Sequence, residues 1–290
     1  MRRQVKIVLE LSKVRITVLA SLTTAMGYLL ASRELTSAVL VPTLGVFLLA
    51  SGSSALNQFQ EWKIDKLMRR TQRRPIPTGR ISPGRALAVA LFLMAAGFLV
   101  LLVGSNAPAA ALGLLAVVWY NGIYTYLKRV TTFAAIPGAV IGGIPPAVGW
   151  AAAGGAVLDP RILAVSVFFF VWQVPHFWLL LLKYGKDYEE AGLPSLTAVW
   201  TTGQLSRVTF VWIAATAVAC LLIPLFGTVR SALVSVGLVA SAMWLVWNAK
   251  GLLREVERGR SFTTAFREIN VYALLVICLL TLDRVLLSLY

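Results

Sequence analysis

Nine apolar runs, each long enough to cross a bilayer, constrain the fold of this chain more than any other feature. A membrane-spanning helix needs about 20 consecutive apolar residues. Only 13% of the residues are charged and the mean hydropathy is +0.79, whereas a soluble domain carries about 25% charged residues. We therefore expect an all-α polytopic membrane protein with nine transmembrane helices. The runs fall at 14–31, 38–58, 85–104, 107–126, 133–153, 161–182, 204–226, 230–249 and 268–288.

The basic residues alternate between the segments that join these runs. With the segments numbered inside and outside in turn, starting inside, all but four of the 27 Lys and Arg residues fall inside. Cytoplasmic loops are enriched in Lys and Arg, so the pattern predicts a cytoplasmic N-terminus, an outside C-terminus and a cell (inner) membrane location. The net charge of +15 then reflects topology, and no nucleic-acid partner is expected. The four exceptions are Arg33, Arg161, Arg230 and Arg284.

A first polar cluster follows the second apolar run. Asn57, Glu61 and Asp65 recur every four residues, which places them on one helix face if the helix continues past the membrane surface. The like charges of Glu61 and Asp65 repel each other, and Mg2+ takes oxygen ligands that it shares with substrate phosphates. Arg70 and Arg74 follow and can donate to phosphate oxygens. The cluster predicts a magnesium diphosphate site; the alternative is a solvated helix end whose charges neutralise one another.

Further polar residues are expected on the same side of the membrane. Asp187, in a loop predicted to run from Lys183 to Gln204, is a candidate second magnesium ligand, and Glu189 and Glu190 are candidate helpers. His176 lies near the inner end of the sixth run, and an ionisable residue within a span is a candidate functional residue. The alternative for His176 is a hydrogen bond within a helix interface.

The fourth and fifth runs contribute further candidates. Lys128 and Arg129 follow the fourth run, near Tyr124. They either bind diphosphate or simply reflect the enrichment of basic residues in inside loops. The fifth run is rich in Gly and Pro, which predicts close helix contacts or a bent cavity wall. Cys220 and Cys278 fall inside spans and are expected to be buried and unbonded.

These motifs resemble those of a known family. The segment from Asn57 to Asp65 resembles the aspartate-rich first motif of the UbiA superfamily of intramembrane prenyltransferases. Three further stretches are similar to the heme O synthases (protoheme IX farnesyltransferases) of that superfamily. The chain departs from the family at Glu61, where Asp is usual, and at Ser195-Leu196-Thr197, where Met-Leu-Pro is usual. The similar stretches are Met68-x-Arg70-Thr71-x-x-Arg74-Pro75, Pro175-His176-Phe177-Trp178 and Asp187-Tyr188-x-x-Ala191-Gly192-x-Pro194.

The resemblance implies one UbiA-like domain over residues 1–290, with the helices around a central chamber. It implies that farnesyl diphosphate donates a farnesyl group to a vinyl group of heme B, with water addition, to give heme O for heme–copper oxidases. The other implied partners are the lipid bilayer and either heme A synthase or oxidase assembly factors. The implied catalytic residues, which would also hold the cofactor Mg2+, are Asn57, Glu61, Asp65 and Asp187.

The resemblance also assigns the remaining site residues. Arg70, Arg74, Lys128 and Arg129 would bind the diphosphate, with a heme propionate as the alternative ligand of Lys128 and Arg129. Tyr124, His176 and Tyr188 would lie on the heme side, where His176 either ligates or orients the iron or acts as an acid or base. The aromatic walls expected around the reacting groups are those of Tyr124, Trp172, Phe177 and Trp178.

Three other functions fit parts of the sequence. A UbiA-type enzyme that prenylates an aromatic quinone precursor would share the first motif. A secondary transporter would place its site near the bilayer midplane, whereas these carboxylates are expected at the inner surface. A non-catalytic assembly protein of a respiratory oxidase would not need the magnesium-type clusters.

Overall fold

The computed structural model describes residues 2–32, 36–254 and 260–288, and these ranges are helical without any strand. Within them, nine helices are long and apolar enough to cross a membrane. Each overlaps one of the nine predicted runs, so the predicted fold class is confirmed. Three charged residues lie outside the described residues: Arg33, and Glu255 and Glu257 in the segment between the last two apolar runs. The elements are α1 (Arg2–Leu11), α2 (Val14–Ser32), η1 (Ser37–Val39), α3 (Leu40–Asp65), α4 (Pro83–Gly104), α5 (Ala107–Val117), η2 (Val118–Tyr124), α6 (Thr125–Leu127), α7 (Ala135–Gly138), α8 (Val140–Ala152), α9 (Pro160–Glu190), α10 (Leu196–Val199), α11 (Thr202–Leu225), α12 (Ala232–Ala249), α13 (Gly251–Arg254) and α14 (Arg260–Ser288).

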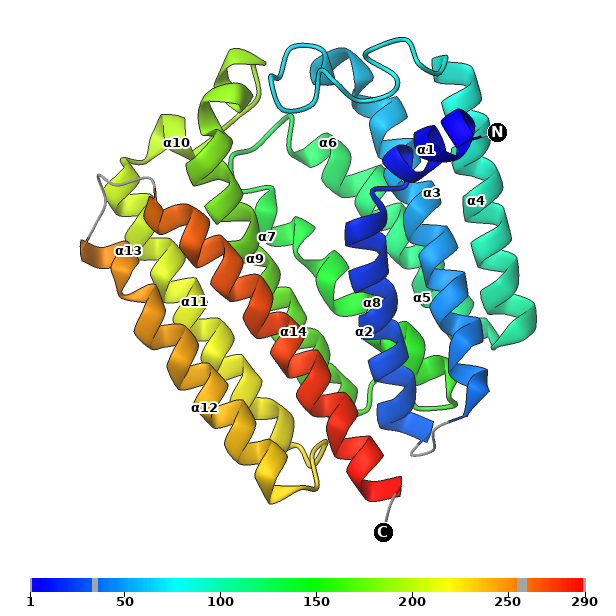
Figure 1. The fold of residues 1–290 in the computed structure, drawn as a ribbon, viewed down its shortest axis with the longest axis vertical. Coiled ribbons are helices and arrows are strands. Elements are labelled where there is room, and N and C mark those ends of the chain that lie inside the picture. The colour runs from blue at the N-terminus through cyan, green and yellow to red at the C-terminus, as the bar shows by residue number, and fades with distance from the viewer. Residues whose placement is uncertain (1, 33–35, 255–259, 289–290) are drawn as a thin grey trace.

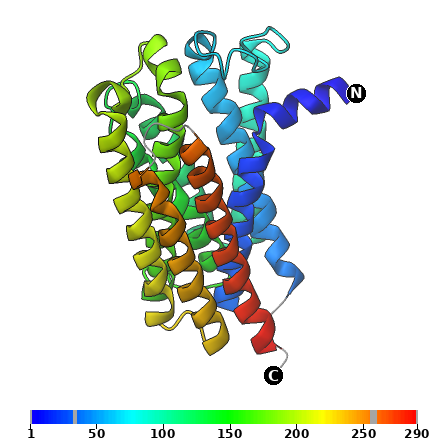
Figure 2. The same ribbon diagram turned by 60° about the vertical axis from the view of Figure 1, so that its left-hand side comes forward.

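The long helices stand side by side, so that their ends form two opposite faces of the bundle (Figure 1). The short helix α1 and the last turns of α3 and α9 lie at one end, while α14 finishes at the other. This separation of the two termini is the arrangement that an odd number of spans requires. Helix α1 projects sideways from the bundle instead of following its axis (Figure 2).

Four apolar clusters hold the bundle together, and two of them show how the long helices group. One joins α9, α11, α12 and α14 through side chains such as Phe168, Ile213 and Leu238. The other joins α3, α4, α5 and α8 around Leu49 and Leu101. Helix α2 packs mainly against α8 and α3. The helices therefore form two packed groups, and the cavity described below lies where these groups meet.

Side-chain caps explain where several of the helices begin. Ser82 accepts from the Arg85 N–H at the start of α4, and Asn106 accepts from the Ala109 N–H at the start of α5. Asp159 does the same for α9, and Thr201 with Gln204 forms a reciprocal capping box on α11. Such caps satisfy amide groups that the first helical turn leaves unpaired.

Two helices are longer than expected. Helix α3 continues to Asp65 and α9 to Glu190, whereas the second apolar run ends at residue 58 and the sequence predicted a loop from Lys183. The cluster on α3 therefore does lie on a continuous helix, and Asp187 is helical instead of lying in a loop. The extension of α3 carries a buried polar face, whereas the extension of α9 ends in the exposed side chains of Glu189 and Glu190.

The predicted close contact of the fifth span is confirmed. A Cβ atom added at Gly149 of α8 would overlap the carbonyl oxygen of Thr24 on α2. Only a glycine allows the two backbones to approach so closely. The prediction for Cys278 was wrong, since this side chain is exposed while Cys220 is buried. Helix α14 evidently turns Cys278 to the outside of the bundle.

Candidate active site

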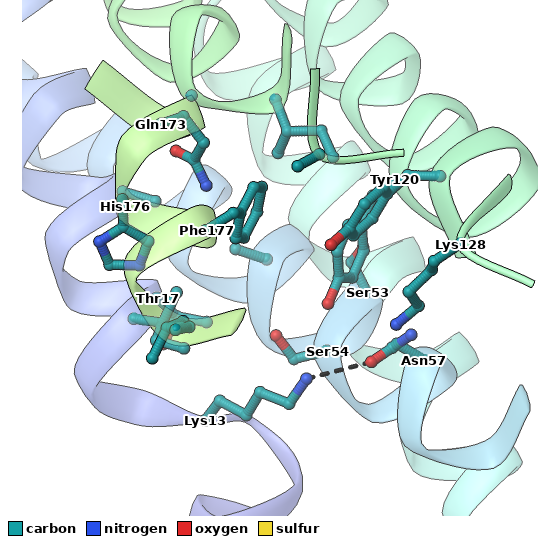
Figure 3. A pocket seen from close by; sticks show the side chains of 18 of the residues that line it. Lys13, Thr17, Ser53, Ser54, Asn57, Tyr120, Lys128, Gln173, His176 and Phe177 are labelled. Atoms are coloured by element: carbon teal, nitrogen blue, oxygen red, sulfur yellow. Dashed lines mark hydrogen bonds between the residues drawn. The ribbon is translucent and has the colours of Figure 1, made fainter. Parts of the chain in front are cut away.

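One cavity of about 810 Å³ opens between the two groups of helices, within the range typical of ligand-binding pockets. Its walls come mainly from α2, α3, α8, α9 and α14, with the loop that follows α3. Figure 3 shows Lys13, Asn57 and Lys128 grouped together, with His176 and Gln173 farther along the cavity. The cavity thus has a charged region near the end of α3 and a more apolar region deeper in the bundle.

The charged region is built on one face of α3. Asn57, Glu61 and Asp65 line the cavity and are only 1%, 8% and 3% exposed. Their spacing of four residues brings them onto one stripe of the helix. Buried carboxylates are costly unless they are paired, so the partners of these three side chains define the electrostatics of the site.

Each of these three side chains is held by its own cation. Lys13 Nζ donates to Asn57 Oδ1 at 3.1 Å. Lys128 Nζ lies 2.6 Å from Glu61 Oε1 and donates to Oε2 at 2.8 Å. Arg74 Nη1 donates to Asp65 Oδ1 at 2.8 Å and to Oδ2 at 2.7 Å. The donors that could hold a metal are thus matched by cations that could hold an anion.

A π-helical turn positions the cation of Lys128. Residues Val118–Tyr124 form this turn, η2, between α5 and α6, and such turns occur often at functional sites. Asn121 in η2 is buried and donates to the Ser53 carbonyl and to Gln60 Oε1 on α3. Thr125, which follows, accepts from Asn57 Nδ2 at 3.1 Å. These bonds fix the segment that carries Lys128 against the face of α3.

The loop after α3 is tied to the end of α9. The backbone N–H of Arg70 donates to Asp187 Oδ2 at 3.2 Å, and the Arg70 guanidinium lies over the Tyr184 ring. Arg69 and Glu190 form an exposed ion pair at 3.5 Å, and Glu189 accepts from Thr197. In the part of the chain that the structure describes, no three Asp, Glu, His or Cys side chains are grouped closely enough to bind a metal. Asp187 therefore faces the loop in this conformation and does not adjoin Glu61 and Asp65.

Like Asp187, two further predicted residues, Arg129 and Trp178, do not line the cavity. Arg129 donates to the Gln60 carbonyl at 2.9 Å and lies over the Tyr126 ring, and it does not line the cavity, unlike Lys128 and Arg74. The prediction that Trp178 forms an aromatic wall was wrong. Its side chain is 1% exposed and packs in the core against Trp200 and Trp212.

Aromatic side chains line the deeper region of the cavity. The rings of Tyr120, Tyr124 and Phe177 stack in series, with centroids 5.8 Å and 5.6 Å apart. His176 lies between Trp172 and Phe266, each with its ring centroid at 4.9 Å. The Nδ1 atom of His176 is buried and has no hydrogen-bond partner among the described residues.

The heme-side candidates therefore share one space with the charged cluster. Tyr124, His176 and Tyr188 all line the same cavity as Asn57, Glu61 and Asp65. Tyr124 connects the two regions, because the Lys128 ammonium lies 5.3 Å from its ring centroid. Tyr124 also stacks on Phe177 in the aromatic region.

Lys13 is the site residue that sequence reasoning missed. Lys13 lies between α1 and α2 in the chain and lines the cavity. Its partner Asn57 is 44 positions away in the sequence. Burial, together with the charges of Arg74 and Lys128, lowers the pKa of Lys13 to about 7. The available signal was a basic residue directly before a span, but loop basicity explains that position equally well.

Comparisons with known proteins agree with this architecture. The family described as the UbiA prenyltransferase family matches residues 20–280. A protoheme IX farnesyltransferase from Geobacter sulfurreducens is 38% identical over 266 residues, covering 91% of this chain and 94% of that protein.

Two solved structures share the fold. One, from work on digeranylgeranylglyceryl phosphate synthase, aligns with a TM-score of 0.76 at 17% identity and covers 98% of this chain and 99% of its own. A UbiA homologue from Archaeoglobus fulgidus bound to GPP and Mg2+ aligns with a TM-score of 0.67 at 14% identity, covering 94% and 99%. At such identities the likeness shows the fold alone.

Proposed function

This chain belongs to the UbiA prenyltransferase family, and we propose that it transfers a farnesyl group from farnesyl diphosphate to heme B, forming heme O. The observation that carries the proposal is the division of one cavity into a cation–carboxylate region and an aromatic region. A prenyl diphosphate has the same division, with a charged head and an apolar chain. The relatives named protoheme IX farnesyltransferase support heme as the acceptor.

The diphosphate would bind in the charged region. Lys128, Arg74 and Arg70 supply donors for phosphate oxygens, and Arg74 and Lys128 would exchange their carboxylate partners for the substrate. Asn57, Glu61 and Asp65 offer only oxygen ligands toward the cavity, which fits Mg2+. Asp187 would complete the set once the loop releases it. Magnesium would neutralise the negative charge that grows on the leaving diphosphate. Arg129, which lies outside the cavity, is assigned the structural role of holding Gln60.

The carbon chemistry would take place among the aromatic side chains. As the bond from farnesyl C1 to the diphosphate oxygen breaks, positive charge develops on the allylic carbons. The faces of Tyr120, Tyr124 and Phe177 can stabilise such a cation, and the apolar walls exclude stray water. A vinyl carbon of heme B then bonds to C1. Water adds to the other vinyl carbon and gives up a proton, which leaves a hydroxyethylfarnesyl group.

His176 is proposed to face the heme. Its imidazole is held between two rings and keeps Nδ1 without a partner, so it is available to a ligand as an iron ligand or as a hydrogen-bonding group. Tyr124 and Tyr188 would line the same side. His176 lies apart from Lys13 and Lys128 in the cavity, so an acceptor beside His176 would be separate from the diphosphate (Figure 3).

The cellular setting follows from the same proposal. We assign the end that carries α1, Asp65 and Lys128 to the cytoplasm, because it holds the basic loops, and the protein to the cell inner membrane. Residues 1–290 would form one domain. Heme A synthase or oxidase assembly factors are the proposed recipients of the product.

The decisive experiment combines the purified protein with farnesyl diphosphate, heme B and Mg2+, and analyses the products by mass spectrometry. We expect heme O, formed only when all three are present. A parallel reaction replaces heme B by 4-hydroxybenzoate. Prenylation of that acceptor without heme O formation would overturn the assignment of heme and favour a quinone precursor.

A further inference from the structure

Lys13 has a backbone conformation that its residue type rarely adopts. Its φ is +47°, the only positive φ of a non-glycine residue in the described ranges. A side chain disfavours this left-handed region, and where it persists the surrounding structure holds it there, often at functional sites. The residue forms the bend that joins α1, which projects sideways, to the spanning helix α2 (Figure 2).

Helix α3 holds this bend in place. The Gln58 side chain, 1% exposed, donates from Nε2 to the carbonyl oxygens of Glu10 and Leu11, both at 3.0 Å. Glu10 in turn pairs with Arg80 at 2.6 Å. Gln58 directly follows Asn57 in the chain, so one turn of α3 holds both the residues just before Lys13 and the side chain that Lys13 contacts.

The contact occupies the atom that a metal would need. Asn57 has a single side-chain acceptor atom, Oδ1, and Lys13 Nζ donates to it at 3.1 Å (Figure 3). The Asn57 amide nitrogen is also engaged, since Nδ2 donates to Glu61 Oε2 at 2.9 Å. Oδ1 keeps a second lone pair, but a metal bound there would lie directly against the Lys13 ammonium. Repulsion between the two cations therefore favours ligation by Asn57 once the ammonium has moved away.

We propose that Lys13 occupies the metal position at Asn57 in the substrate-free enzyme and moves onto the diphosphate when metal and diphosphate bind together. This inference rests on the proposed function and adds a residue to its donor site. A lysine suits the exchange, because its ammonium is a compact charge on a flexible four-carbon stem. Lys128 and Arg74, which flank the same face of α3, would meet the same anion.

The exchange has two opposite consequences for binding. A metal ion that binds without diphosphate must displace the Lys13 ammonium. No anion then offsets the positive charges of the metal, Lys13, Lys128 and Arg74, so the metal alone binds weakly. Diphosphate offers Lys13 a new partner, so metal and diphosphate favour each other. Removal of the ammonium should therefore strengthen the binding of metal alone and weaken the binding of diphosphate.

The test uses the full-length protein in detergent, with Lys13→Met and with Lys13→Gly, which also suits a left-handed backbone. Mn2+ binding without diphosphate is followed by electron paramagnetic resonance, and binding of inorganic diphosphate with Mg2+ by calorimetry. In both variants we expect Mn2+ to bind roughly tenfold more tightly and diphosphate roughly tenfold more weakly. Lys66→Met is the matched control, since Lys66 is exposed and lies over Trp62.

The outcomes separate this inference from the proposed function. Mn2+ binding that stays unchanged or weakens in both Lys13 variants, while the wild type binds diphosphate normally, overturns the exchange alone. The proposed donor site itself is overturned if the wild type binds neither Mn2+ nor diphosphate. It is also overturned if Asp65→Asn binds both probes as well as the wild type does. Tighter Mn2+ binding in Lys13→Gly but not in Lys13→Met would assign the effect to the backbone and also contradict the exchange.

Discussion

Nζ of Lys128 lies 2.6 Å from Oε1 of Glu61, and this ion pair joins two segments that are 67 positions apart in the chain. Both side chains are largely buried, at 19% and 10% exposure. A buried ion pair is weak evidence for stability, because the desolvation of both charges offsets their attraction. In the proposed function, the pair forms two halves of a site, Glu61 for a metal and Lys128 for an anion.

The first prediction concerns Lys128. Replacement by Met removes a charged donor from the diphosphate and leaves Glu61 without its cation. We expect kcat/KM for farnesyl diphosphate to fall roughly 10- to 100-fold, the effect of losing one charged hydrogen bond. Steady-state kinetics at fixed heme B measure it. Lys66→Met is the control and should stay near the wild type, because Lys66 is exposed and does not line the cavity; equal losses in both variants would contradict the assignment.

The second prediction concerns the carboxylates Asp65 and Asp187. Asp65→Asn and Asp187→Asn should each abolish turnover, since each removes a proposed metal ligand, while the protein still inserts into the membrane. Activity in membranes of matched protein content is the measurement. Glu190→Gln serves as the control because Glu190 forms an exposed ion pair with Arg69. Full activity in both Asp variants would remove these residues from the site.

The third prediction concerns His176. In the His176→Ala variant, heme B should bind more weakly and with a changed absorption spectrum, because the imidazole facing the heme is lost. Binding of inorganic diphosphate with Mg2+ should not change, since Lys128 and Asn57 lie elsewhere in the cavity (Figure 3). A spectral titration and a calorimetric titration test the two halves. A loss of diphosphate binding with normal heme binding would place His176 on the donor side.

The fourth prediction concerns the contact between α2 and α8. Gly149→Ala inserts a methyl group against the Thr24 carbonyl, and overpacking of this kind costs about 1–3 kcal/mol. We expect the midpoint of thermal unfolding in detergent to fall by at least ~2 °C. Gly84→Ala is the matched control, because no atom lies within 4 Å of a Cβ added there. An unchanged midpoint for Gly149→Ala would show that the helices can separate at no cost.

Hydropathy and charge predicted most of the fold. The spans could be located because a bilayer leaves few alternatives to a helix of fixed length. The stripe of Asn57, Glu61 and Asp65 could be predicted because it depends only on helical periodicity. In the structure this stripe is a buried face that lines the cavity, because α3 continues to Asp65.

The long-range pairing could not be predicted. The sequence grouped Lys128 with Arg129, but only the π-helical turn and its bonds to α3 direct Lys128 to Glu61. Trp178 and Phe177 are neighbours in one motif, yet α9 turns one into the core and the other into the cavity. Lys13 reaches Asn57 through a bend with an unusual φ, which no periodicity reveals.

The central claim is that the face of α3 binds a magnesium diphosphate. Its most direct test is the binding of an unreactive thio analogue of farnesyl diphosphate to the wild type and to Asp65→Asn, with and without Mg2+. We predict tight binding to the wild type only when Mg2+ is present, and none to Asp65→Asn. Equal binding with and without Mg2+, or equal binding to both proteins, would contradict the claim.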